Sequence, residues 1–167
     1  MQKFKCMKND SEKSNSGLLP FSKDHYAGAL FSWKIRQGLK YHVEKQRMLD
    51  YINYFWNHYF SGHFKEEEEL LFGLVKDHQV KKALADHQQI KTVFKKIKKS
   101  GLQDGDDILL ELSDTIDSHI RFEERVLFPY LCKSLSDKQL KNIAGQLARE
   151  PLVDDYQDQF WTKSKSL

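Results

Sequence analysis

Cysteine, proline and glycine are all scarce in this sequence, and each shortage excludes a class of structure. Only Cys6 and Cys132 are cysteines among the 167 residues, too few for a disulfide framework or a Cys-x-x-Cys metal pair, so a reducing, cytoplasmic compartment is expected. Three prolines and eight glycines favour long helices joined by short turns. No apolar run is long enough to cross a membrane, and the first residues lack the apolar core of a secretory signal.

A strong charge imbalance is also lacking. With 27 basic against 24 acidic residues the net charge is +3, which by itself does not predict nucleic-acid binding. Lysines do concentrate between Lys76 and Lys99. We interpret them as the solvated face of a helix, with a docking surface for an acidic partner as the alternative.

The expected organisation is a disordered N-terminal segment, one domain and a tail, at residues 1–17, 18–150 and 151–167. Four long helices are predicted, the first capped by Ser22 and the others at about 45–72, 77–99 and 106–131. Pro129 is expected to kink or fray the fourth helix. Ser136 is predicted to open a short fifth helix, and the sequence leaves open whether Phe160 and Trp161 of the tail pack back.

The helices are predicted from apolar residues that recur at steps of three and four, the period of a helix with one buried face. The predicted buried face of the second helix is Leu49, Ile52, Trp56, Tyr59, His63, Glu67, Leu70 and Leu74. The predicted buried face of the third helix is Val80, Leu84, His87, Ile90, Phe94 and Ile97. The predicted buried face of the fourth helix is Leu109, Leu112, Ile116, His119, Glu123, Val126 and Tyr130. The fold class is therefore all-α: an up-down-up-down four-helix bundle with a short extra C-terminal helix.

Two of these faces carry a histidine followed four residues later by a glutamate, His63 with Glu67 and His119 with Glu123. An ionised carboxylate on a core face is costly unless it is paired or bound to a metal. The i, i+4 spacing puts both side chains on one helix face, within reach of one or two adjacent cations. Nitrogen and oxygen donors together suit iron, zinc or manganese better than calcium or magnesium.

The other two helices each add one histidine. His87 lies on the third face, and His25 on the first helix is followed on its own face by the small residues Gly28, Ala29 and Ser32. The sequence HFKEEEELLF also aligns with HIRFEERVLF, and Asp24-His25 parallels Asp86-His87. Two such halves, related by a pseudo-two-fold axis, predict a symmetric centre for two metals.

The spacing along the chain tests whether these side chains can meet, because residues at equal depth are equidistant from the turn that joins their helices. The point midway between His87 and His119 falls in the turn SGLQDGD, and that between His63 and His87 falls just after Gly73. The point midway between His25 and His63 falls in HVEKQ, where the sequence has no turn signal.

From about Phe21 to Leu131 the chain resembles the hemerythrin-like HHE cation-binding family, through KDHYAGALFSWKIRQGL, FWNHYFSGHFKEEEELLF, LADHQQI and DSHIRFEERVLFPYL. The resemblance implies a non-haem site for two iron ions, with zinc or manganese as the alternatives, bridged by the carboxylates of Glu67 and Glu123. The ligands that it implies are His25, His63, Glu67, His87, His119 and Glu123.

One departure bears on function. Oxygen-carrying hemerythrins have a fifth histidine one turn from the third-helix ligand, where this chain has Ala83 and Lys91. The site is therefore similar to that of the four-His, two-Glu subgroup, which includes iron-centre repair and nitric-oxide-responsive proteins. Simple oxygen transport is accordingly disfavoured.

Several nearby polar residues are interpreted differently. His58 is expected at the surface or beside the ligands, and His42 and His78 are expected to be structural or solvent-exposed. Glu66, Glu68 and Glu69 are expected to be solvated, with Glu66 the one alternative to Glu67 as ligand. Tyr59 and Tyr130 are interpreted as core residues, with a hydrogen bond to a bound ligand as the alternative for each.

The leading hypothesis is a metal-binding protein that binds or senses O2 or NO. Turnover of NO or peroxide, donation of iron to damaged iron–sulfur proteins, and a metal-free helical interaction module are the alternatives. No nucleic-acid or membrane partner is expected, and the sequence leaves open whether the chain is a monomer or a homodimer.

Overall fold

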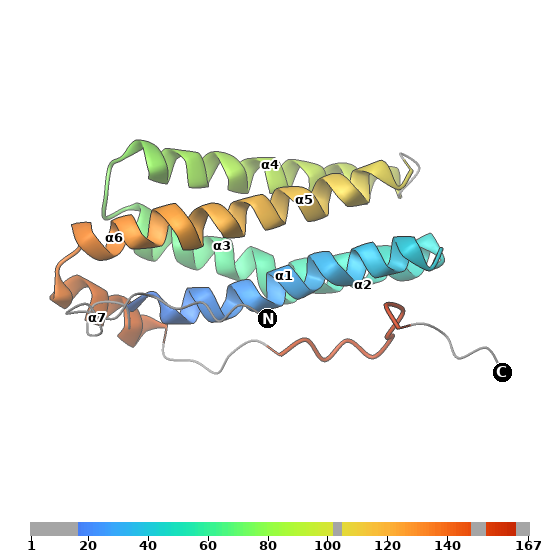
Figure 1. Ribbon diagram of the computed structural model, residues 1–167, viewed down its shortest axis with the longest axis horizontal. Coiled ribbons are helices and arrows are strands. Elements are labelled where there is room, and N and C mark those ends of the chain that lie inside the picture. Colours follow the sequence, from blue (N-terminus) through green and yellow to red (C-terminus); the bar gives the residue numbers. More distant parts are fainter. Residues whose placement is uncertain (1–16, 102–104, 148–152, 163–167) are drawn as a thin grey trace.

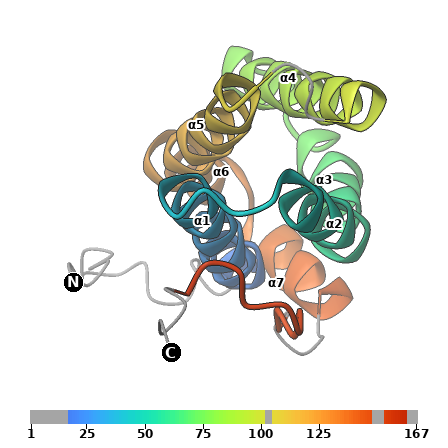
Figure 2. The same ribbon diagram turned by 90° about the vertical axis from the view of Figure 1, so that its right-hand side faces the viewer.

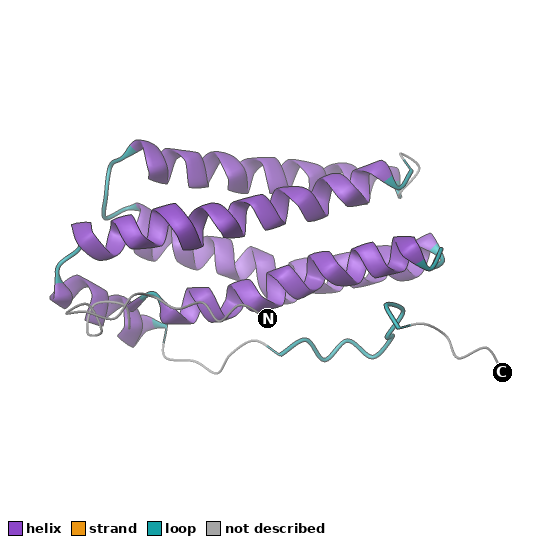
Figure 3. Cartoon of the chain, viewed as in Figure 1, coloured by secondary structure: helices purple, strands orange, loops and turns teal. Residues whose placement is uncertain are grey.

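The computed structural model describes residues 17–101, 105–147 and 153–162, and in these ranges all regular structure is helical (Figure 3). Most of the expected disordered segment 1–17, and with it Cys6, lies outside the described residues. The elements in chain order are α1 (Leu19–Lys40), α2 (Lys45–Phe55), η2 (Trp56–Phe60), α3 (Ser61–Glu67), η3 (Glu68–Phe72), α4 (His78–Ser100), α5 (Asp107–Phe122), η4 (Glu123–Leu127), α6 (Phe128–Ser134) and α7 (Asp137–Gln146). The three η elements are single π-helical turns, so the bundle has four arms: α1, α2–η2–α3–η3, α4 and α5–η4–α6.

Neighbouring arms run antiparallel, with α7 across one end (Figure 1). Viewed along the bundle, the four arms stand at the corners of a closed arrangement in which α5 packs on both α1 and α4 (Figure 2). The expected all-α bundle with a short extra helix is confirmed. Among the residues that the structure describes, no helix is both long and apolar enough to cross a membrane.

Several helix ends follow the expected local signals. Asp77 caps α4 by accepting a hydrogen bond from the backbone N–H of Gln79, and Gly101 ends that helix in the left-handed conformation, with φ of 58°. Ser136 and Gln139 form a reciprocal capping box at the start of α7. The predicted ends of the third helix and the start of the fifth are thus confirmed.

Two other predictions, the Ser22 cap and the fraying at Pro129, are wrong. Ser22 is not a cap, because α1 already begins at Leu19 with Pro20 in its first turn. Proline is favoured at that position because its fixed φ suits a helix. A backbone N–H there would have no partner within the helix, so its absence costs nothing. Pro129 also sits early in a helical segment, α6, and the arm continues to Ser134 without fraying.

The turn between the first two arms has no glycine or proline signal. The chain reverses between Tyr41 and Glu44, where His42 adopts a positive φ of 51°. Such a backbone is uncommon for a residue with a side chain. The turn nevertheless lies midway along the chain between His25 and His63, as it must if these two histidines are at equal depth in the bundle.

The buried faces shift by one residue where the π turns occur. Three residues predicted to be in the core are exposed: Leu74, Leu84 and Val126. Leu71 and Leu127 are buried instead, each four residues after a buried glutamate. A π turn holds about one residue more than an α turn, so the prediction, which assumed a constant period, loses register there. In α4 the buried position is that of Ala83 rather than its neighbour Leu84.

The apolar core consists of two clusters on either side of a polar layer. The first cluster lies toward the α1–α2 turn and includes Phe31, Phe55, Phe64, Ile90 and Ile116. The second lies toward α7 and includes Phe21, Leu71, Leu127, Phe128 and Leu140. Polar side chains between two such clusters are shielded from water on both sides.

The C-terminal tail packs on α1 and α2, which answers a question that the sequence left open. Phe160 is buried against Tyr51, with ring centroids 5.3 Å apart. The Lys34 ammonium lies 2.6 Å from the Asp154 carboxylate and 3.6 Å from the centroid of the Trp161 ring. The Tyr51 hydroxyl donates a hydrogen bond of 2.5 Å to the same carboxylate.

We predict that Asp154→Ala lowers the free energy of unfolding by about 3 kcal/mol, because it leaves the buried Lys34 ammonium without its counter-charge. The side chains of Lys34 and Asp154 are only 5% and 6% exposed. Urea denaturation followed by circular dichroism measures the change.

A matched control lies in the same tail. Asp158→Ala removes an exposed ion pair with Arg47 and should cost less than about 1 kcal/mol. Equal losses in the two variants would contradict the assignment of Asp154 as the anchor of the tail.

Candidate metal centre

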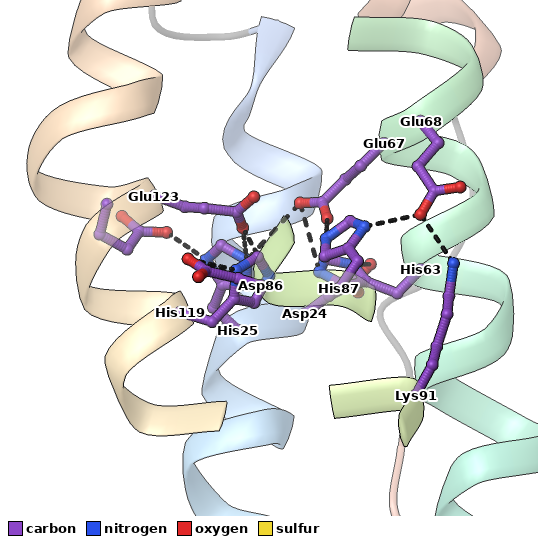
Figure 4. A network of polar contacts seen from close by, with 11 residues as sticks. Asp24, His25, His63, Glu67, Glu68, Asp86, His87, Lys91, His119 and Glu123 are labelled. Atoms are coloured by element: carbon purple, nitrogen blue, oxygen red, sulfur yellow. Dashed lines mark hydrogen bonds and ion pairs between the residues drawn. The ribbon is translucent and has the colours of Figure 1, made fainter. Parts of the chain in front are cut away.

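The four arms bring six polar side chains together in the layer between the two apolar clusters (Figure 4). They are the six that the sequence predicts: His25, His63, Glu67, His87, His119 and Glu123. None is more than 6% exposed, and both carboxylates are fully buried. The structure therefore brings every predicted site residue into one buried cluster.

The six donors form two overlapping groups that share both carboxylates. One group is His25, His63, Glu67 and Glu123, the other Glu67, His87, His119 and Glu123, and within each the ligand atoms lie within 4.8 Å of one another. Glu67 faces both groups, because its Oε1 is 3.3 Å from His63 Nε2 and its Oε2 is 3.3 Å from His87 Nε2.

The second carboxylate has a similar place. Glu123 Oε2 lies 3.0 Å from His25 Nε2 and 3.4 Å from His119 Nε2. Donors about 2.0 to 2.2 Å from one metal, at tetrahedral or octahedral angles, lie roughly 2.9 to 3.5 Å apart. These nitrogen–oxygen distances therefore match the spacing of ligands around a metal.

Helix geometry explains how each arm presents its pair of donors. The i, i+4 spacing places His63 above Glu67 and His119 above Glu123 on one face. A π turn begins at or directly after each glutamate, with η3 beginning at Glu68 and η4 at Glu123 itself. Isolated π turns in helices occur frequently at functional sites, and here they occur at equivalent places in the two halves.

Two carboxylates that are not among the six donors contact the outer ring nitrogens, Nδ1, of two of the histidines. Glu124 Oε1 is 2.7 Å from His25 Nδ1, and Glu68 Oε1 is 2.8 Å from His87 Nδ1. Glu68 also accepts a hydrogen bond of 2.8 Å from Lys91 Nζ. The expectation that Glu68 is merely solvated is wrong, and its alignment with Glu124 in the repeat was the signal that could have identified it.

Aspartates face the other two histidines from a greater distance, beyond that of a hydrogen bond. Asp24 Oδ2 lies 3.6 Å from His63 Nδ1, and Asp86 Oδ2 lies 3.9 Å from His119 Nδ1. A carboxylate on the outer nitrogen orients an imidazole and leaves its inner nitrogen free to bind a metal. Each of these four acidic residues is thus the neighbour in sequence of a donor, and each lies beside a histidine of another arm.

Electrostatics favour an ionised Glu67. Burial raises the pKa of Glu67, but the neighbouring His63 and His25 outweigh burial and lower this pKa well below its ordinary value. Burial lowers the pKa of His25, but the adjacent carboxylates of Glu123 and Glu124 outweigh burial and raise it well above its ordinary value. A proton on His25 therefore competes with a metal, and metal binding releases it.

The inner atoms of the cluster have no protein hydrogen-bond partner among the described residues. They are His25 Nε2, His87 Nε2, His119 Nε2, and both carboxylate oxygens of Glu67 and Glu123. Buried polar atoms are rarely left this way unless a water or an ion completes them. The residues present therefore fit a pair of metal ions.

The remaining polar candidates lie elsewhere. Glu66 belongs to neither group of donors. His42, His58 and His78 are exposed, as expected, and His58 Nδ1 lies 2.7 Å from the backbone oxygen of Tyr54. Tyr130 is partly buried and packs against the second apolar cluster.

A narrow cavity adjoins the centre on the side of the first apolar cluster. It is lined by His25, His63 and His119, by Asp24 and Gly28, and by Phe55, Tyr59, Phe60, Phe64, Ile116 and Ile120. Its volume of about 10 Å³ holds about one water-sized molecule. Most of its lining is apolar.

The comparison with protein families agrees with this geometry. The hemerythrin HHE cation binding domain matches residues 29–131, which is more than half of the chain and includes five of the six donors. His25 lies four residues before the matched stretch. Neither the curated proteins nor the solved structures contain a significant match. The chain thus belongs to the hemerythrin HHE cation-binding domain family.

Proposed function

We propose that the chain holds two iron ions, one in each group of donors, and binds a diatomic ligand, O2 or NO, beside them. His25 and His63 would hold one ion, His87 and His119 the other, and the carboxylates of Glu67 and Glu123 would bridge the two. When bound, the iron pair supplies open coordination positions and redox capacity. The protein supplies a dry site with fixed donors.

The cavity is the observation that carries the choice of ligand. It lies directly against histidines of both groups, and its volume of about 10 Å³, room for about one water-sized molecule, favours a very small ligand over an organic substrate. Its apolar lining favours a neutral molecule, since a charged one would lose its hydration there. O2 and NO have both properties.

Iron donation to damaged iron–sulfur proteins is less favoured. All six donor side chains are buried between the two apolar clusters, so iron could leave only through an opening of the bundle. A protein that binds a gas needs no such opening. Turnover of NO or peroxide would use the same cavity, and stoichiometry separates it from binding: a binding protein stops at one equivalent per centre.

We predict about two irons per chain after anaerobic loading of the wild type, and almost none in the double variant Glu67→Ala/Glu123→Ala, which lacks both shared ligands. Elemental analysis measures the content. Glu69→Ala is the matched control, because its side chain is 63% exposed, and it should retain the wild-type content. A folded wild type that binds no metal would overturn the proposal.

We predict that Gly28→Ala slows NO association with the iron-loaded, reduced protein by about tenfold while the iron content stays unchanged. The added methyl group would extend into the cavity and meet Ile120 Cδ1 at 3.0 Å. Stopped-flow spectroscopy measures the rate. Gly145→Ala in α7 is the control, because no atom lies within 4 Å of its added methyl group. An unchanged rate in Gly28→Ala would show that NO does not enter by this cavity.

A further inference from the structure

The hydroxyl of Tyr59 is buried without a partner. The residue is 4% exposed, and its hydroxyl has no hydrogen-bond partner among the described residues. Two tyrosines earlier in the same arm differ, since the Tyr51 hydroxyl donates to Asp154 and the Tyr54 hydroxyl to Asp155. Buried phenol groups usually find a partner, so the exception needs an explanation.

Tyr59 is one of the residues that line the cavity. It belongs to the π turn η2, one turn before His63, and it lines the cavity together with that histidine. Its ring is stacked on that of Phe55, with centroids 4.1 Å apart and planes 4° from parallel. The stacking holds the ring in one orientation, so the hydroxyl has a fixed position.

The other polar groups that line the cavity lie beside charged or polar neighbours. The Nδ1 atom of His25 contacts Glu124, and that of His119 faces Asp86. Asp24 faces His63. Among the described lining residues, the other unpartnered polar atoms are ring nitrogens of the three proposed metal ligands His25, His63 and His119, so the hydroxyl of Tyr59 is the unpartnered group that belongs to no metal ligand.

We propose that Tyr59 is a positioning residue whose hydroxyl donates a hydrogen bond to the diatomic ligand held in the cavity beside the two metal ions. This inference rests on the proposed function, because it presupposes that a diatomic ligand binds there. The cavity holds about one small molecule, so any ligand within it lies close to the groups of the lining. The donor then selects ligands with an exposed acceptor atom, such as O2 and NO, over those without one.

The hydroxyl is suited to donate rather than to accept. Burial, together with the negative charges of Asp154 and Asp24, raises the pKa of Tyr59 above its ordinary value. The phenol therefore keeps its proton at neutral pH. A neutral donor also adds no charge to the cavity.

The test uses NO with the full-length, iron-loaded, reduced protein and measures the N–O stretching frequency by infrared spectroscopy in H2O and D2O. A hydrogen bond to the ligand weakens the N–O bond, so we expect a shift on deuteration in the wild type. In Tyr59→Phe we expect a higher frequency, no deuterium shift and NO dissociation about tenfold faster. Tyr54→Phe, which removes a hydroxyl outside the cavity, should behave as the wild type.

The outcomes separate this inference from the proposed function. If the iron-loaded wild type does not bind NO, the proposed function fails and the role of Tyr59 with it. If NO binds but its frequency is the same in H2O and D2O, or is unchanged in Tyr59→Phe, the role of Tyr59 alone is overturned. The deuterium shift of the wild type requires no variant, so the test stands even if Tyr59→Phe does not fold.

Discussion

The whole structure depends on holding two carboxylates, Glu67 and Glu123, in a layer that water does not reach. Both are fully buried between two apolar clusters, where an unpaired carboxylate would cost several kcal/mol. Four imidazoles surround them, and the inner atoms of the cluster have no protein hydrogen-bond partner among the described residues. Two cations in the two groups of donors would neutralise both carboxylates and complete these atoms.

The repeat in the sequence accounts for the way the arms are held around this layer. Each half provides an Asp-His pair and a His-x-x-x-Glu-Glu segment, and the residue beside each donor faces a histidine of another arm: Asp24 faces His63, and Glu124 contacts His25. The same relation recurs in the other half, with Glu68 and His87 and with Asp86 and His119. The donors and the carboxylates that orient them are therefore one network, which a change in the position of any arm would disturb. Such preorganisation keeps imidazole nitrogens aimed inward before a metal arrives.

Much of this arrangement could be predicted from the sequence, because helical periodicity and equal spacing from the turns are local rules. They predicted that the six donors would meet, although metal binding by these residues stays a prediction. The π turns were not predictable from a constant period, and they moved the core positions from Leu70 and Val126 to Leu71 and Leu127. Glu68 was misjudged because its partner, His87, lies on another arm. The tail packs through Asp154 and Phe160, long-range contacts for which the sequence has no signal.

The most direct test of the central claim is the position of the metals themselves. Crystals of the iron-loaded protein, measured with X-rays at the iron absorption edge, should show two anomalous peaks about 3.5 to 4 Å apart. One peak should lie beside His25 and His63, the other beside His87 and His119, with Glu67 and Glu123 between them. A single peak, or peaks outside this layer, would contradict the account.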